Sequence, residues 1–148
     1  MNNTDRALLR HMQRDASLSI AELAELTAMS KSACWRRVQK LEEQGVIRQR
    51  VTLLDASALG LPLTVFIAVK TNAHNQAWAT RFKAVTENIA GVLEVYRMGG
   101  DVDYLIKAVV ADMAGYDALY QELIQADLFD VSASFVMEEL KQTTELPV

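Results

Sequence analysis

The chain has 148 residues, 51% of them hydrophobic and 23% charged, so it can bury a sizeable core and is neither disordered nor of low complexity. It has no apolar stretch after a basic start and no run of about 18 apolar residues, so we expect no signal peptide, no membrane span and a cytoplasmic location. The net charge of -4 is uneven: residues 1–50 carry nine Lys or Arg against six Asp or Glu, and residues 51–148 carry six against thirteen. This asymmetry predicts a basic module for nucleic acid joined to an acidic module with another task.

Two short amphipathic helices are predicted first. Residues 5–15 place Leu8, Leu9 and Met12 at helical spacing, with Asp5 near the helix N-terminus. Ser19 and Glu22 then form a capping box that predicts the start of a second helix. The buried side of this second helix is expected to consist of Ile20, Leu23, Ala24 and Leu26.

A third helix of about four turns is predicted within residues 31–47. Ser30 is a suitable N-cap, and Gly45 can supply the left-handed residue that ends the helix. One narrow stripe is apolar and consists of Cys34, Val38 and Leu41. The single cysteine is therefore interpreted as a core residue rather than a redox or metal site. The opposite side is cationic, which suits a helix in a DNA major groove but, taken alone, also fits a solvated basic surface.

The short connection at residues 28–30 favours the first of these alternatives. A tight turn between two short helices is typical of the helix-turn-helix, in which the second helix of the pair reads DNA. After Gly45, a β-branched stretch with cations at Arg48 and Arg50 predicts a small wing strand. Residues 1–54 are thus expected to form a winged helix-turn-helix domain that binds double-stranded DNA. The expected DNA-binding residues are Ser30, Lys31, Ser32, Trp35, Arg36, Arg37, Gln39, Lys40, Arg48 and Arg50.

A linker is predicted at residues 55–62, where Gly60 and Pro62 interrupt the pattern, and a second domain at residues 63–148. Its strands are expected at residues 64–70, 92–98, 104–110 and 131–140, and its helices at residues 77–89 and after a capping Asp112. This order of strand, helix, strand, strand, helix, strand is the ferredoxin-like βαββαβ pattern, so the fold class is α+β. Two helices cover one face of such a sheet, and an open apolar face predicts a dimer or larger assembly.

The two domains resemble one known family. In the first domain the matching residues are Asp5-Arg6, Leu8-Leu9, Leu23-Ala24, Ser30, Arg37-Val38, Leu41-Glu42 and Gly45-Val46-Ile47. In the second they are Gly100-Asp101-Val102-Asp103-Tyr104, Ser134-Phe135, Met137-Glu138, Lys141, Thr143-Thr144 and Leu146-Pro147. The chain is thereby similar to the Lrp/AsnC family, the leucine-responsive and asparagine regulators. The resemblance implies a C-terminal RAM domain that dimerises through its sheets, a higher assembly such as a tetramer or octamer, and a nucleoid-associated location.

The resemblance also implies an amino-acid effector bound between dimers near residues 98–104. A glycine-rich hairpin can offer N–H groups to a carboxylate and Asp103 can pair with an ammonium group, whereas without the resemblance this stretch would be an ordinary turn. The expected ligand-binding residues are Met98, Gly99, Gly100, Asp101, Asp103 and Tyr104, with Ser132 and Ser134 from a neighbouring subunit. The end of the chain and Cys34-Trp35 are most similar to one branch of the family, which includes a cysteine-responsive activator. This narrower resemblance makes cysteine the candidate effector.

Catalysis is not predicted. His11 and His74 lie in different domains without a Cys or carboxylate at metal-ligand spacing, and the sequence contains no phosphate loop or nucleophile motif. We therefore expect no catalytic residue, no metal and no cofactor other than the effector. The sequence predicts a DNA-binding regulator of amino-acid metabolism, with an architectural DNA-binding oligomer that lacks an effector as the alternative.

Overall fold

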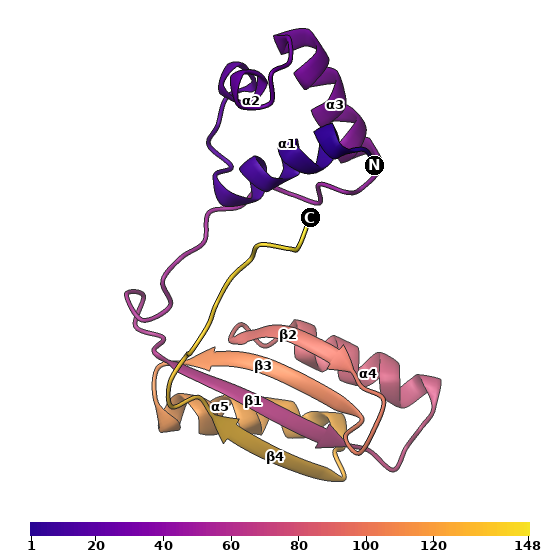
Figure 1. Ribbon diagram of the computed structural model, residues 1–148. Coiled ribbons are helices and arrows are strands. Elements are labelled where there is room, and N and C mark those ends of the chain that lie inside the picture. Colours follow the sequence, from indigo (N-terminus) through magenta and orange to yellow (C-terminus); the bar gives the residue numbers. More distant parts are fainter. The chain divides into compact units, whose positions relative to one another are not determined.

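The computed structural model describes residues 1–148, which form two compact units (Figure 1). The first unit comprises Met1–Leu53 together with Leu140–Val148, and the second comprises Leu54–Glu139. The sequence places Leu140–Val148 in the C-terminal domain, and in the structure their contacts group them with the N-terminal unit. None of the helices combines the length and the apolar character that crossing a membrane requires.

Three helices of the first unit pack around one small core. They are α1 (Asn3–Arg14), α2 (Ile20–Leu26) and α3 (Lys31–Glu43). Each begins at a side chain that accepts a hydrogen bond from the first turn, and these N-caps are Asn2, Ser19 and Ser30. The buried core confirms the predicted apolar stripes and consists of Leu8, Leu9, Leu23, Ala24, Cys34, Val38 and Leu41. Burial also raises the pKa of the Cys34 thiol, as expected of a core cysteine.

Two local predictions about this unit are wrong. Leu26 is 52% exposed, because at about 100° per residue it lies about 110° round α2 from the middle of the buried pair Leu23 and Ala24. Residues 46–54 form no wing strand, since a strand needs a neighbouring strand for its backbone hydrogen bonds and no segment pairs with this one. Instead, the N–H groups of Val46 and Ile47 both donate to the carbonyl of Leu41, at 2.9 and 3.1 Å. Gly45, with φ of 69°, allows this closure of α3, as its sequence position predicts.

The second unit has the predicted ferredoxin-like order, and the α+β class is confirmed. Its elements are β1 (Leu63–Lys70), α4 (Gln76–Glu87), β2 (Val92–Arg97), β3 (Tyr104–Val110), α5 (Met113–Leu123), the short 3₁₀ turn η1 (Ile124–Ala126) and β4 (Asp130–Phe135). The last strand ends at Phe135 and not at residue 140. It stops there because its partner β1 begins at Leu63, and the N–H of Val136 makes the last bond to that strand, at the carbonyl of Thr64.

The strands form one antiparallel sheet in the order β2-β3-β1-β4, and α4 and α5 both cover the same face of it (Figure 1). The core between helices and sheet contains Val65, Ile67, Val69, Trp78, Phe82, Ile106, Ala108, Leu119 and Leu123. On the opposite face, Phe66 pairs with Lys107 and Ser134, and Ala68 pairs with Leu105 and Ser132. This open face is therefore mixed, and the prediction of an apolar face holds only for part of it.

Candidate DNA-binding surface and ligand hairpin

The outward side of α3 gathers hydroxyl, aromatic and cationic side chains. Its apolar stripe faces the core, so the residues between the stripe positions point into solvent. The exposed residues of α3 are Lys31, Ser32, Trp35, Arg36 and Lys40, together with Glu43 at its end. Ser30 accepts a hydrogen bond from the N–H of Ala33 at 3.2 Å and lies 3.4 Å from the hydroxyl of Ser32. Short hydroxyls at the helix N-terminus and long cations one turn later suit contacts to base edges and phosphates respectively.

Arg37 lies at the side of α3 and is engaged by α1. Its Nη1 donates to the carboxylate of Asp5 at 2.7 Å and to the side-chain oxygen of Asn2 at 3.4 Å. The backbone N–H of Asn2 and the Arg37 guanidinium together hold the pKa of Asp5 below its ordinary value. The structure thus places Arg37 where it fixes the start of α1 against the recognition helix, rather than on the outward surface.

Glu42 similarly engages two of the predicted DNA-binding residues. Its carboxylate accepts from Arg50 at 2.7 Å and from the Gln39 amide at 3.2 Å. Arg48 makes no ion pair within the chain, nor do Lys31, Arg36 and Lys40. The cations free to meet phosphates therefore lie on the outward side of α3 and in the segment after it.

A hollow of about 520 Å³ opens between α3 and the start of α1. Its charged lining consists of Arg36, Arg37 and Lys40 from α3 and Asp5 from α1, and Met1 and Asn2 line it from the segment before α1. Such a cationic concavity suits a phosphate group. Met1 and Asn2 were not among the predicted residues, because the first helix was expected to start at Asp5, although the Asn2–Asp5 spacing is that of a capping box.

The turn between β2 and β3 is a tight hairpin supported by Asp103. The N–H of Met98 donates to the carbonyl of Asp103 at 2.8 Å, and the N–H of Asp103 donates to the carbonyl of Val69 at 3.0 Å. One carboxylate oxygen of Asp103 accepts from the N–H of Thr71 at 2.9 Å. Asp103 therefore joins the hairpin to the end of β1, and its other carboxylate oxygen makes no hydrogen bond within the chain.

The tip of the hairpin is exposed and has unused donors. Gly99, Gly100 and Asp101 are all exposed, and no hydrogen bond within the chain engages the N–H groups of the two glycines. The φ of 128° at Gly100 is a conformation that side chains with a Cβ rarely adopt, so a glycine is needed there. Free N–H groups beside two carboxylates match the two charged ends of an amino acid.

The remaining predicted ligand residues lie apart from this tip. The ring of Tyr104 packs 4.6 Å from Phe82 and 5.4 Å from Trp78, centroid to centroid, so it belongs to the aromatic core. Ser132 and Ser134 lie on the open sheet face on β4, which β1 separates from β3. At about 4.8 Å per strand this puts them roughly 10 Å from β3. Within one chain, residues 98–103 thus lie together in the hairpin, and Ser132 and Ser134 lie apart from them.

Both units match known families. Residues 64–146 match the Lrp/AsnC ligand binding domain, and residues 1–48 match a winged helix-turn-helix DNA-binding domain. Over 149 residues the chain is 45% identical to the glutamate uptake regulatory protein of Zymomonas mobilis, covering 100% of this chain and 91% of that protein. Over 150 residues it is 41% identical to the DNA-binding transcriptional activator DecR of Escherichia coli, covering 100% of this chain and 99% of that protein.

A solved structure agrees over nearly the whole chain. A transcriptional regulator of Neisseria meningitidis in complex with L-Met superposes with a TM-score of 0.93 at 32% identity, covering 99% of this chain and 96% of that one. The two-unit architecture is thus shared with a protein that binds an amino acid.

Proposed function

The chain belongs to the Lrp/AsnC family of DNA-binding transcriptional regulators, and we propose that a small amino acid bound at the β2–β3 hairpin alters its assembly or its affinity for operator DNA. The observation that carries this proposal is the exposed hairpin tip, where the free N–H groups of Gly99 and Gly100 lie beside Asp101 and Asp103. The exposed cationic side of α3 supplies the DNA-binding surface that such an effector would control.

The two carboxylates divide the recognition of the effector. Asp103 uses one oxygen to accept from Thr71, so its free oxygen and the exposed Asp101 are the groups that meet the ammonium. The glycine N–H groups meet the effector carboxylate. The effector side chain then contacts a neighbouring subunit, for which Ser132 and Ser134 on the open face are our candidates. Small hydroxyl groups suit a small polar side chain, and cysteine is the effector that we propose to test first.

The assembly is proposed to form through the open sheet faces. Phe66 is 36% exposed on this face, with Leu105 on the neighbouring strand and Lys107 opposite Glu94. Apolar side chains interspersed with opposite charges suit a self-complementary dimer. Dimers then associate into tetramers or octamers. The paired α3 helices of a dimer read DNA half-sites spaced by about one helical turn or a multiple of it. We place this binding in the nucleoid of the cytoplasm. Sedimentation as a monodisperse monomer at micromolar concentration would contradict this assembly.

Calorimetry with the twenty amino acids tests the effector. We expect heat with one small amino acid, with cysteine measured first under reducing conditions and then glutamate and methionine, which the names of the two relatives suggest. Silence with every amino acid would favour the architectural alternative.

The informative variant is Asp103→Asn. Its amide oxygen can still accept from Thr71, so the hairpin geometry is kept while the charge that meets the ammonium is lost. Effector affinity should fall by a factor of ten or more, because a hydrogen bond to a charged group contributes roughly 1.5–3 kcal/mol. Asp117→Asn on α5, which removes an exposed charge far from the hairpin in sequence, is the matched control. If Asp103→Asn and Asp117→Asn bind the effector as the parent does, the site lies elsewhere.

A further inference from the structure

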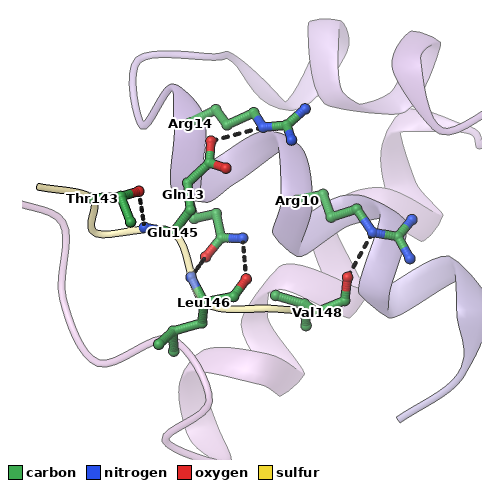
Figure 2. Close-up of polar contacts among 7 residues, drawn as sticks. All are labelled: Arg10, Gln13, Arg14, Thr143, Glu145, Leu146 and Val148. Atoms are coloured by element: carbon green, nitrogen blue, oxygen red, sulfur yellow. Dashed lines mark hydrogen bonds and ion pairs between the residues drawn. The ribbon is translucent and has the colours of Figure 1, made fainter. Parts of the chain in front are cut away.

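The last residues of the chain dock on the first helix. Residues 143–148, the docking segment, lie along one side of α1, where Arg10, Gln13 and Arg14 face them (Figure 2). These three positions are spaced i, i+3 and i+4, so they form one stripe on the helix, which borders the buried side at Leu9.

Gln13 makes the most specific contact. Its side-chain oxygen accepts from the N–H of Leu146, and its side-chain nitrogen donates to the carbonyl of the same residue, both at 2.9 Å (Figure 2). The amide thus pairs with the main chain as a neighbouring strand would. Leu146 precedes Pro147, which biases its backbone to an extended conformation, and Pro147 has no N–H to leave unpaired. The sequence therefore favours the extended backbone that this pairing with Gln13 needs.

Two further contacts fix the register of the segment. The Nε of Arg10 donates to the main-chain oxygen of Val148 at 2.7 Å, and the side chain of Val148 packs against the core of the first unit. Arg14 pairs with Glu145 at 2.8 Å, with side chains 63% and 40% exposed. An exposed ion pair contributes little, so the Gln13 amide and the buried part of Val148 carry most of the docking.

We propose that the Arg10–Gln13–Arg14 stripe of α1 is a docking surface whose partner is the docking segment of the same chain, and that docking joins the two units by a second connection. The first connection is the segment that follows α3. The second runs from β4 through residues 136–142 to the docked segment. A DNA-binding unit held at two points has less rotational freedom than one held at one, so the docking segment restricts the orientation of α3.

The variant Gln13→Glu tests this proposal in the full chain. Glutamate is isosteric and favours helix, but its carboxylate cannot donate to the carbonyl of Leu146 and lies beside Glu145. We expect the amide of Leu146 to exchange with solvent about tenfold faster, while the amides of α1 keep their protection. We also expect a shorter rotational correlation time for the α3 amides in ¹⁵N relaxation. Asn3→Asp makes the same chemical change on the first turn of α1, away from the segment, and should alter neither measurement.

Two outcomes of the exchange and relaxation measurements overturn the proposal. One is a Leu146 amide that exchanges in the parent at the rate of an unstructured chain. The other is a Gln13→Glu protein with unchanged exchange and unchanged correlation time. Should Gln13→Glu unfold α1, Glu145→Lys keeps the test available, because it places a cation opposite Arg14 and disturbs the docking from the segment side alone.

Cross-linking decides which chain supplies the segment. In an Arg14→Cys, Glu145→Cys double variant, a short bifunctional maleimide should join the two thiols within one chain, so that the product migrates as a monomer on a denaturing gel. The parent, whose single Cys34 is buried, controls for reaction at that thiol. A product of two joined chains would instead assign the segment to a second copy and overturn docking within one chain.

Discussion

Replacing Arg37 with alanine should weaken the N-terminal unit without removing a phosphate contact. The Arg37 guanidinium lies 2.7 Å from the Asp5 carboxylate, with side chains 36% and 17% exposed. A fully exposed pair is worth roughly 0.2–1 kcal/mol and a charge-assisted hydrogen bond roughly 1.5–3 kcal/mol. Since Asp5 keeps the hydrogen bond from the N–H of Asn2, we expect a loss of about 1 kcal/mol in the free energy of unfolding.

The pH dependence follows from the lowered pKa of Asp5. The N–H of Asn2 is its largest cause, followed among the groups that lower it by Arg37. A carboxyl whose pKa is lower in the folded state stabilises the fold above its ordinary value of about 4, and this stabilisation is lost as the pH falls through the folded pKa. The difference in stability between parent and Arg37→Ala should therefore be constant near neutrality and vanish in strong acid.

Two measurements on the same variant separate the structural role from DNA contact. Hydrogen exchange of the α3 amides in denaturant reports the stability of the unit, and gel-shift titrations at several salt concentrations report the phosphate contacts. Arg37→Ala should keep the slope of log affinity against log salt. Arg36→Ala should make it shallower by about 0.9 and leave the stability unchanged. A slope reduced by about 0.9 in Arg37→Ala, with parental stability, would show that Arg37 contacts a phosphate and refute this reasoning.

Two further predictions concern backbone geometry. Ala28 has a φ of 52° in the turn between α2 and α3, so Ala28→Gly should stabilise the N-terminal unit by about 1 kcal/mol, measured by thermal unfolding. A Cβ at Gly91 would lie 2.7 Å from the carbonyl oxygen of Val109, so Gly91→Ala should destabilise the second unit by about 2 kcal/mol or more. Gly99 has open space where a Cβ would lie, so Gly99→Ala should leave the stability unchanged. Equal effects of the two substitutions would contradict the clash at Gly91.

The elements that were predictable from sequence are those whose signals are local. Ser19 with Glu22 and Ser30 with Gly45 mark helix ends within a few residues, and the short, nearly continuous apolar run at residues 64–70 predicts the central strand β1. The wing failed as a prediction because β-branched composition indicates a tendency to form a strand and not the presence of a partner strand. The position of Arg37 was not predictable either, since its Asp5 partner lies on another helix, 32 residues away in the chain.

Asp103 shows why the site was harder to predict than the fold. The motif Gly-x-x-Asp-Tyr identifies the hairpin, yet it does not indicate that the Asp103 carboxylate accepts from Thr71 while Tyr104 turns into the aromatic core. In the proposed site the same carboxylate would support the turn and bind the effector, so an effector bound to Asp103 would also act on the end of β1. Replacing it with alanine would remove both tasks at once. Only a substitution that keeps the acceptor for Thr71, such as asparagine, can separate loss of the ligand from collapse of the hairpin.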